Sequence, residues 1–318
     1  MKLGAFIVPT GIGASIGGFA GDASTYARMF AKNNKLIVNP NVVNAACFSG
    51  ITDNMLYVEG YSLDEFFRGK CRLEESCGNK IGVIFDKSIP EPVLNVHINT
   101  INAVKTVYGI NIIDWELTEE EVGVEFFVDQ SLNSMGNVKN LSTLKQATQN
   151  LISKGAEAIA IVCHFPEEQG DDYAKGIGVD PVGGVEAIIS HYISKEFQVP
   201  CAHAPAFSDI SISTEIVDNR CSAEYITPTF LPCILIGLSN APKINKDSGV
   251  SIEDLDFLIM PYNALGGIPV LEAVKRGKKV YAVKENSSVL NVTQENFVAQ
   301  CDIMNTYREL AELIDEKH

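Results

Sequence analysis

The sequence predicts an α/β protein with mainly parallel sheets and helices on both faces. Short apolar runs that suit buried strands alternate with stretches whose apolar residues recur at helical spacing. Glycine-rich turns follow several of these runs, a pattern typical of the passage from a strand into a helix. We therefore expect two Rossmann-like subdomains with a cleft between them, residues 1–150 and residues 151–318.

Composition limits the class of protein. The 318 residues can bury a substantial core, and eight cysteines without a signal-peptide pattern suit the reducing cytoplasm. The longest apolar runs are too short to cross a bilayer. A formal charge of −15 without a basic patch disfavours nucleic acid. We expect a soluble cytoplasmic protein whose partner is a small metabolite, with no membrane or nucleic-acid partner and with homo-oligomers left open.

The expected helices and strands follow from the spacing of apolar residues and from the residues that begin or end these elements. Buried strands are predicted at short, mainly apolar runs, and helices where apolar residues recur at a period near 3.6. Residues 130–137 are polar and are expected to form a loop, whereas His97 is expected on a helix surface. Strands are predicted at residues 3–8, 35–38, 80–85, 111–117, 123–129, 156–162, 198–202, 230–238, 256–260 and 279–283. Helices are predicted at residues 23–32, 95–108, 138–153, from 181 onward, 268–276 and 306–316.

Residues 155–209 concentrate the groups that transfer protons. Cys163 and His164 follow one predicted strand, and His203 follows the next, with Asp209 shortly after. The carboxyl ends of parallel strands are preferred catalytic positions, and successive strands are often neighbours. We therefore expect Cys163 or His164 to share a cleft with His203 or Asp209.

Two further residues are added to this catalytic set. Cys47 lies in a polar segment after a strand, where it is a candidate nucleophile or acid-base group. Glu186 and His191 lie about 140° apart around a helix, so both cannot face one small ligand. We expect Glu186 to be the functional one because it is closer to the sheet edge.

Three glycine-rich helix starts predict binding of a small anionic metabolite, because free amides and the helix dipole favour anions there. Asp22 and Asp180 are the expected N-caps of two of these helices. Two asparagines at strand ends are expected opposite the catalytic set. The predicted substrate-binding residues are Gly13, Ser15, Gly17, Gly18, Asp180, Gly183, Gly184, Asn263, Gly266, Gly267 and Asn286.

No cofactor is predicted. The spacing of Gly11, Gly13 and Gly17 is one residue too long for the dinucleotide fingerprint, and no lysine stands where a P-loop needs one. A divalent metal is left open, with His164 and His203 as ligands together with Cys163, Cys201, Glu186 or Asp209.

Three functions remain open from these residues. Cofactor-independent proton transfer, as in a racemase, epimerase or isomerase, would use thiols such as Cys47 and Cys163 as base and acid. A metal-dependent hydrolase or lyase would use the His, Cys and acidic ligands. A non-catalytic binding protein would use the glycine-rich turns alone, and the histidines and cysteines could also be packing groups of the core.

Two families resemble this chain. IVCHFPE at Cys163, the separation of Cys47 from Cys163 and the glycine-rich opening are similar to the aspartate/glutamate racemase superfamily, which implies two-thiol proton transfer. The threonine between the cysteine and histidine of that motif, and the Asn-Thr after the first cysteine, are missing here. Over nearly the whole chain, and most plainly in GVDPVGGVEAIISH, PCAHAPA and PYNALGG, the sequence resembles the DUF3326-type proteins, a resemblance that implies no activity.

Overall fold

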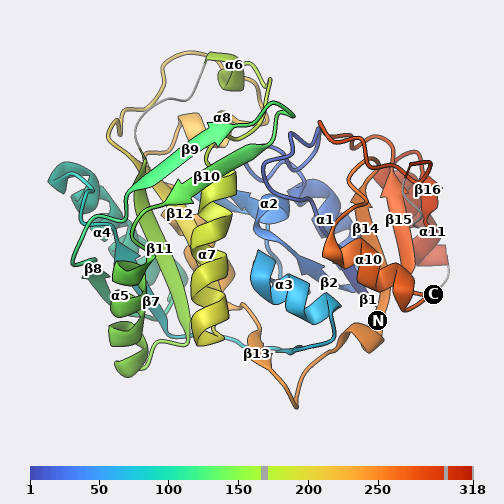
Figure 1. The fold of residues 1–318 in the computed structure, drawn as a ribbon, viewed down its shortest axis with the longest axis horizontal. Coiled ribbons are helices and arrows are strands. Elements are labelled where there is room, and N and C mark those ends of the chain that lie inside the picture. Colours follow the sequence, from blue (N-terminus) through green and yellow to red (C-terminus); the bar gives the residue numbers. More distant parts are fainter. Residues whose placement is uncertain (166–170, 297–299, 317–318) are drawn as a thin grey trace.

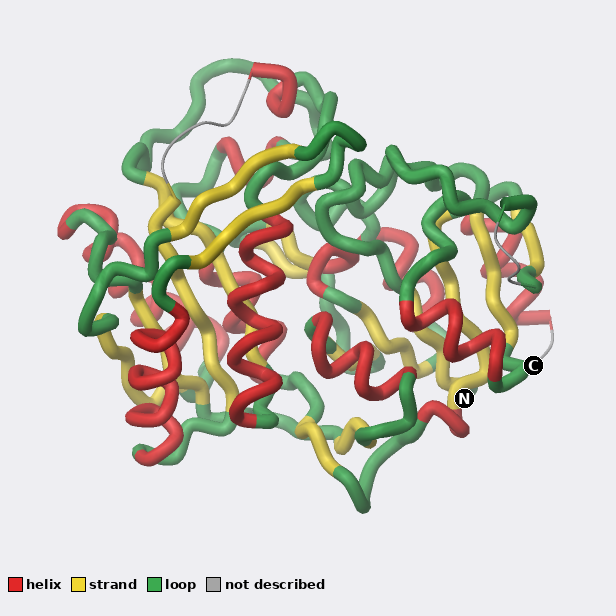
Figure 2. Tube along the Cα trace, in the orientation of Figure 1, coloured by secondary structure: helices red, strands yellow, loops and turns green. Residues whose placement is uncertain are grey.

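Two parallel β-sheets form the centre of the molecule, a computed structural model that describes residues 1–165, 171–296 and 300–316 (Figure 1). The larger sheet has six strands and the smaller has four, and neighbouring strands within each are parallel. Figure 2 shows the two sheets side by side, each with helices around it. The predicted α/β class with mainly parallel sheets is confirmed.

The larger sheet is built from both ends of the chain. β1 lies inside it, with β2 on one side and β14 on the other, so the strand order reverses at β1. Ligands of open α/β sheets bind at the carboxyl ends of strands beside such a reversal. Its order is β16 (Asp302–Met304), β15 (Lys279–Val283), β14 (Leu255–Pro261), β1 (Leu3–Phe6), β2 (Lys35–Val38) and β5 (Met55–Tyr57).

The smaller sheet is built from the middle of the chain. Its order is β12 (Cys201–Phe207), β11 (Ala158–Phe165), β7 (Ile81–Phe85) and β8 (Ile112–Leu117). Residue 150, where the two subdomains were expected to divide, lies inside helix α5 (Leu141–Ser153). The smaller sheet takes two strands from each side of that residue, so the two sheets are not separated there.

Helices cover both faces of each sheet because the central strands are buried and apolar on both sides. α1 (Ser24–Ala31) and α11 (Tyr307–Glu316) cover one face of the larger sheet, and α3 (Gly60–Phe67) and α10 (Ile268–Lys275) cover the other. α4 (Glu91–Tyr108) and α9 (Leu231–Ser239) cover one face of the smaller sheet. α5 and α7 (Gly183–Phe197) cover its opposite face. α3 and α7 pack together between the sheets.

The shorter elements connect these layers. They are α2 (Pro40–Val43), α6 (Asp171–Ala174), α8 (Ser222–Tyr225), a 3-10 turn at Ile252–Asp254 and three antiparallel strand pairs, β3 (Asn44–Ala45) with β4 (Phe48–Ser49), β6 (Arg72–Glu74) with β13 (Lys243–Asn245), and β9 (Val124–Val128) with β10 (Ser134–Val138). The loop predicted at residues 130–137 is therefore wrong in its second half, because β10 pairs with β9 and packs against α7.

The strand predicted at residues 230–238 is wrong, because these residues form helix α9. A short apolar run cannot be assigned to strand or helix by periodicity alone. Pro232 in the first turn suits a helix start, since its missing N–H has no partner there in any case. The helix is apolar around its whole circumference because it lies between the smaller sheet and α4.

The expectation that His97 lies on a helix surface is also wrong. Its side chain is fully buried on α4, with Nδ1 2.8 Å from the carbonyl oxygen of Val93 and its ring 6.0 Å from that of Phe85. The buried stripe of α4 runs through Val93, His97, Ile101 and Val104, at helical spacing.

No helix in the described ranges has the length and apolar character needed to cross a membrane.

Candidate functional site

A cavity of about 120 Å³ lies where the carboxyl ends of the two sheets meet. It is open to solvent on one side, and its walls come from residues 9–20, 40–46, 173–186, 203–207 and 224–234. The first two segments follow β1 and β2 of the larger sheet, and the fourth is the end of β12. The cavity is therefore at the position that α/β folds use for ligands.

The glycine-rich loop after β1 forms one wall of this cavity. Gly17 has a φ of +83°, and a Cβ on Gly18 would come within 2.1 Å of the Ala14 carbonyl oxygen, so the loop requires glycine at both positions. Gly13, Gly17 and Gly18 line the cavity as predicted residues, whereas Ser15 turns away from it. The Ser15 amide donates to the Ser287 carbonyl oxygen at 2.7 Å.

Asp22 satisfies the amides of this loop. It accepts hydrogen bonds from the backbone N–H of Gly17 at 2.8 Å and of Phe19 at 3.2 Å. Burial raises the pKa of Asp22 to about 6. The prediction that Asp22 caps α1 is wrong, since the N-cap is Ala23 and has no side-chain hydrogen bond. These amides are occupied, so they do not support an anion site.

The start of α7 is occupied in the same way. Asp180 precedes the helix and accepts from the Val182 amide at 3.0 Å, and the Gly184 amide donates to Ser134 Oγ at 2.9 Å. A Cβ on Gly184 would lie 2.3 Å from the Ser134 carbonyl oxygen. Gly184 therefore lets β10 approach the helix start, and its amide is not available to an anion. Gly183 does not line the cavity, whereas Asp180 does.

The predicted residues of the C-terminal part lie outside the cavity walls. Asn286 is fully buried, accepts from the Ile16 amide at 3.0 Å and donates to Tyr307 Oη at 2.7 Å. Asn263 donates to the Ser288 carbonyl oxygen at 2.9 Å. Gly266 and Gly267 are exposed before α10. These asparagines hold loops in place, and Asn286 fixes the glycine-rich loop from behind.

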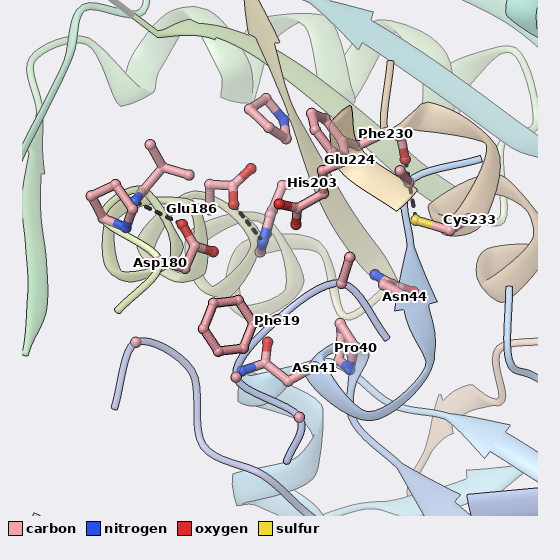
Figure 3. A pocket seen from close by; sticks show the side chains of 18 of the residues that line it. Phe19, Pro40, Asn41, Asn44, Asp180, Glu186, His203, Glu224, Phe230 and Cys233 are labelled. Carbon is pink, nitrogen blue, oxygen red and sulfur yellow. Dashed lines mark hydrogen bonds and ion pairs between the residues drawn. The ribbon is translucent and has the colours of Figure 1, made fainter. Parts of the chain in front are cut away.

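Glu186 and His203 form the chemical centre of the cavity (Figure 3). His203 Nε2 lies 3.7 Å from Glu186 Oε2, and His203 Nδ1 lies 2.9 Å from Ser190 Oγ. Ser190 Oγ also lies 3.4 Å from the carbonyl oxygens of Glu186 and Ala187 on α7. The contact with Ser190 orients the ring so that Nε2 is directed toward Glu186. Glu186 Oε1 is buried and has no hydrogen-bond partner in the described chain.

Burial favours the neutral form of both groups in this pair. Burial, followed by the neighbouring carboxyls of Asp180 and Glu224, raises the pKa of Glu186 well above its usual value. Burial, followed by the charge of His191, lowers the pKa of His203 to about 3. His203 is therefore neutral at pH 7, so the contact at 3.7 Å is not an ion pair.

Two more carboxyl groups face the same cavity. Glu224 on α8 accepts a hydrogen bond from Tyr173 Oη at 3.3 Å, and burial raises its pKa to about 8. Burial also raises the pKa of Asp180. Figure 3 shows Asp180, Glu186 and Glu224 arranged around His203. No lysine or arginine is among the described residues that form the walls.

The predicted cysteines are not brought together at the cavity. β11 and β12 are adjacent as predicted, but Cys163 is 2% exposed and packs in the core under α7. Burial raises the pKa of the Cys163 thiol well above its usual value, and nearby Asp86 and Glu186 add to this. Cys47 accepts a hydrogen bond from Thr227 Oγ1 at 3.3 Å outside the cavity walls. The one cysteine in the described walls is Cys233, whose pKa burial raises to about 12.

His164 and His203 lie on opposite faces of the smaller sheet. His203 faces α7 and contacts Ser190. His164 lies on the same face of β11 as Val162, the face covered by α9, and its Nε2 is 2.8 Å from Ser208 Oγ. They cannot share one metal ion. No group of three or more His, Cys, Asp or Glu side chains within the described residues is placed to hold a metal.

Asp209 and His191 also lie outside the cavity walls. Asp209 is exposed, and hydrogen bonds from the side chain of Ser211 and from its amide, at 2.7 Å, lower the pKa of Asp209. His191 faces α3, with its ring 6.1 Å from that of Tyr61, so Glu186 rather than His191 faces the cavity as expected. Pro166 and Glu167 of the IVCHFPE motif lie outside the described residues.

Sequence reasoning missed Glu224, Tyr173 and the aromatic walls. Glu224 stands in a four-residue helix within a passage that carries no motif. Asn41 and Asn44 could have been found, because both follow β2 in the polar segment predicted at the sheet edge.

Comparison with known proteins places the chain in one family. No solved structure matches it. It is 38% identical over 314 residues to an uncharacterized lipoprotein of Synechococcus sp., covering 95% of this chain and 87% of that protein. Residues 4–316 match the family described as protein of unknown function DUF3326. The chain belongs to the DUF3326 family.

Proposed function

We propose that the cavity is the active site of an enzyme that moves a proton to and from a small polar metabolite, with His203 and Glu186 as the acid-base pair. The observation that carries this proposal is the pair itself. His203 Nε2 lies 3.7 Å from the Glu186 carboxyl, burial raises the pKa of Glu186 and lowers that of His203, and both side chains face one cavity. Neighbouring groups whose environments push their pKa values apart are typical of acid-base catalysis.

Ser190 supports this assignment as a positioning residue. Its Oγ lies 2.9 Å from His203 Nδ1 and so orients the ring with Nε2 toward Glu186. A base oriented by a third group is a recurring feature of catalytic sites. The reaction class, cofactor-independent proton transfer of the racemase, epimerase or isomerase type, thus rests on carboxyl and imidazole groups and not on Cys47 and Cys163.

The side chains that form the cavity walls also indicate the charge of the ligand. Three carboxyl groups and no described basic side chain face the cavity, and two amides of the glycine-rich loop, those of Gly17 and Phe19, are already bonded to Asp22. These walls favour a neutral or cationic group beside Glu186 and not the anion that the glycine-rich turns predict.

The experiment needs no knowledge of the substrate. The purified chain is incubated with a small-molecule metabolite extract in D₂O, and proton NMR is used to find C–H signals that disappear through exchange with solvent. We expect loss of at least one signal with the wild-type protein and no loss with Glu186→Gln or His203→Gln. Glu59→Gln is the matched control, because Glu59 is a buried glutamate outside the cavity walls.

Two alternative functions are outcomes of the same experiment. Compounds that bind without exchange, and whose binding survives loss of His203, would indicate a non-catalytic binding protein. Activity that requires an added divalent ion would indicate the metal-dependent hydrolase or lyase, although the described residues offer no preformed metal ligand set.

Localisation is a separate proposal. The sequence predicts the cytoplasm, whereas the relative from Synechococcus sp. is named a lipoprotein, which favours a membrane-anchored form. Fractionation of cells that express the native protein distinguishes the two, because a lipid-anchored form sediments with membranes and is released by detergent.

A further inference from the structure

The walls of the cavity combine carboxyl groups with aromatic rings. Asp180, Glu186 and Glu224 supply the carboxyls. The aromatic side chains that face the same space are Phe19, Tyr173, Phe207 and Phe230. Carboxylate oxygens accept hydrogen bonds from a cation, and the faces of aromatic rings attract it, so both kinds of wall suit the same ligand charge.

Glu186 gives a second, independent sign of a ligand. Its side chain is 8% exposed, and Oε1 has no hydrogen-bond partner among the described residues, whereas Oε2 faces His203. A buried carboxyl oxygen without a partner destabilises the fold, because it has lost its hydrogen bonds to water. The oxygen has almost no accessible surface, but Glu186 lies in the cavity wall (Figure 3), so a turn of its carboxyl group toward the cavity would let a donor on a bound molecule satisfy it.

The shape of the acidic cluster favours an organic cation over a metal ion. A metal ion requires several ligand atoms to meet within about 2–2.6 Å of one point, and no three described side chains do so. A primary ammonium group has three N–H donors that point in different directions. Each donates to an oxygen at about 2.8 Å, so the group can bond to carboxyl groups that lie apart from one another.

We propose that the metabolite bound in this cavity carries a primary ammonium group, whose N–H donors bond to Glu186 Oε1 and to the carboxyl groups of Asp180 and Glu224. The proposal rests on the proposed function only in taking this cavity as the site. The aromatic rings of Phe19 and Tyr173, whose centroids lie 5.2 Å apart, border the space beside these carboxyls.

Proton release on binding follows from this arrangement. Burial raises the pKa of Glu224 to about 8, so this carboxyl holds a proton near neutral pH. A bound ammonium group favours the ionised carboxylate of Glu224 and lowers this pKa. The wild-type protein therefore releases protons to the buffer as the cation binds.

The test is isothermal titration of the full chain with three four-carbon probes, the diamine putrescine, the neutral butanediol and the dicarboxylate succinate. Putrescine is expected to bind, with heats that differ between two buffers of different ionisation enthalpy because protons are released. Glu186→Gln is expected to weaken this binding by about tenfold or more, since one charge-assisted hydrogen bond is lost. Glu59→Gln keeps it unchanged.

Three results would overturn the inference: no binding of putrescine, binding of succinate in its place, or saturable binding of Mn²⁺ or Zn²⁺ alone that is lost in Glu186→Gln. Circular dichroism of Glu186→Gln confirms that the variant is folded before its binding is compared. If D₂O exchange occurs but putrescine does not bind, this inference fails and the proposed function stands. If putrescine binds as expected but no compound exchanges a proton, the cation site stands and the proposed function fails.

Discussion

His203 Nδ1 lies 2.9 Å from Ser190 Oγ, which joins the end of β12 to the middle of α7. This contact holds the imidazole in the orientation that directs Nε2 toward Glu186, 3.7 Å away. Because Ser190 is itself buried, the ring cannot exchange this bond for one to bulk water. The contact between these two residues therefore decides which ring nitrogen faces Glu186.

Ser190→Ala removes the hydroxyl that contacts His203 Nδ1. We expect solvent exchange of the substrate proton to slow by about ten- to hundredfold, since misplacement of a catalytic group has effects of that size. Stability should fall by only about 1 kcal/mol, the value of one hydrogen bond. Nitrogen NMR of His203 distinguishes the two roles, because a change of ring tautomer accompanies loss of positioning. An unchanged tautomer with full activity would contradict the role given to Ser190.

Gly184→Ala tests the close approach of β10 to α7. The added Cβ would lie 2.3 Å from the Ser134 carbonyl oxygen, so backbone must shift, and we expect a loss of about 1–3 kcal/mol in the free energy of unfolding. Gly267→Ala is the control, because its Cβ meets its nearest neighbour, Pro269 Cδ, at 3.6 Å. Denaturant unfolding that shows equal stability for both variants would contradict the packing described here.

Glu59 makes stability depend on pH in the neutral range. Burial raises its pKa to about 7, above the ordinary value of 4.5. The folded state therefore binds the proton more tightly than the unfolded chain, so this contribution is fully present below pH 4.5 and is lost as pH rises through 7. Its size is about 3 kcal/mol. Between pH 5 and 8, the free energy of unfolding of Glu59→Gln should fall less than that of the wild type. An equal fall in both proteins would mean that another group causes the pH dependence.

His203 makes the folded protein less stable as the pH falls, the opposite of the effect of Glu59. Burial lowers its pKa to about 3, whereas an unfolded histidine titrates near 6.5. The unfolded chain binds the proton between these values and the folded chain does not, so stability falls as pH drops from 6.5 toward 3. His203→Gln should make the free energy of unfolding less sensitive to acid in this window. A wild-type acid dependence that survives the substitution would contradict a neutral, buried His203.

The fold could be predicted largely from the sequence because buried parallel strands carry continuous apolar runs, as in residues 158–163. The same property explains the error at α9, whose apolar run has no distinguishing period. His97 was misplaced because a helix packed on one broad face can bury a polar ring that bonds its own backbone at Val93. Such a bond leaves no mark in the sequence.

The candidate site was predicted in part. Glu186, His203, Asp180 and three glycines do line the cavity, since strand ends and helix starts can be located from sequence. The face of β11 on which a residue lies could not be chosen, so His164 was grouped with His203 although a one-residue step reverses the side chain. Glu224 lies far along the chain, and its place beside Glu186 depends on tertiary packing alone.

The most direct measurement of the central claim is a crystal structure of the full chain with the compound whose proton exchanges. The account predicts that the exchanging carbon lies about 3–3.5 Å from His203 Nε2, with Glu186 in contact with the same molecule. A compound bound outside this cavity, or one whose reacting carbon faces Cys47 or Cys163 while His203 and Glu186 remain remote, would contradict it.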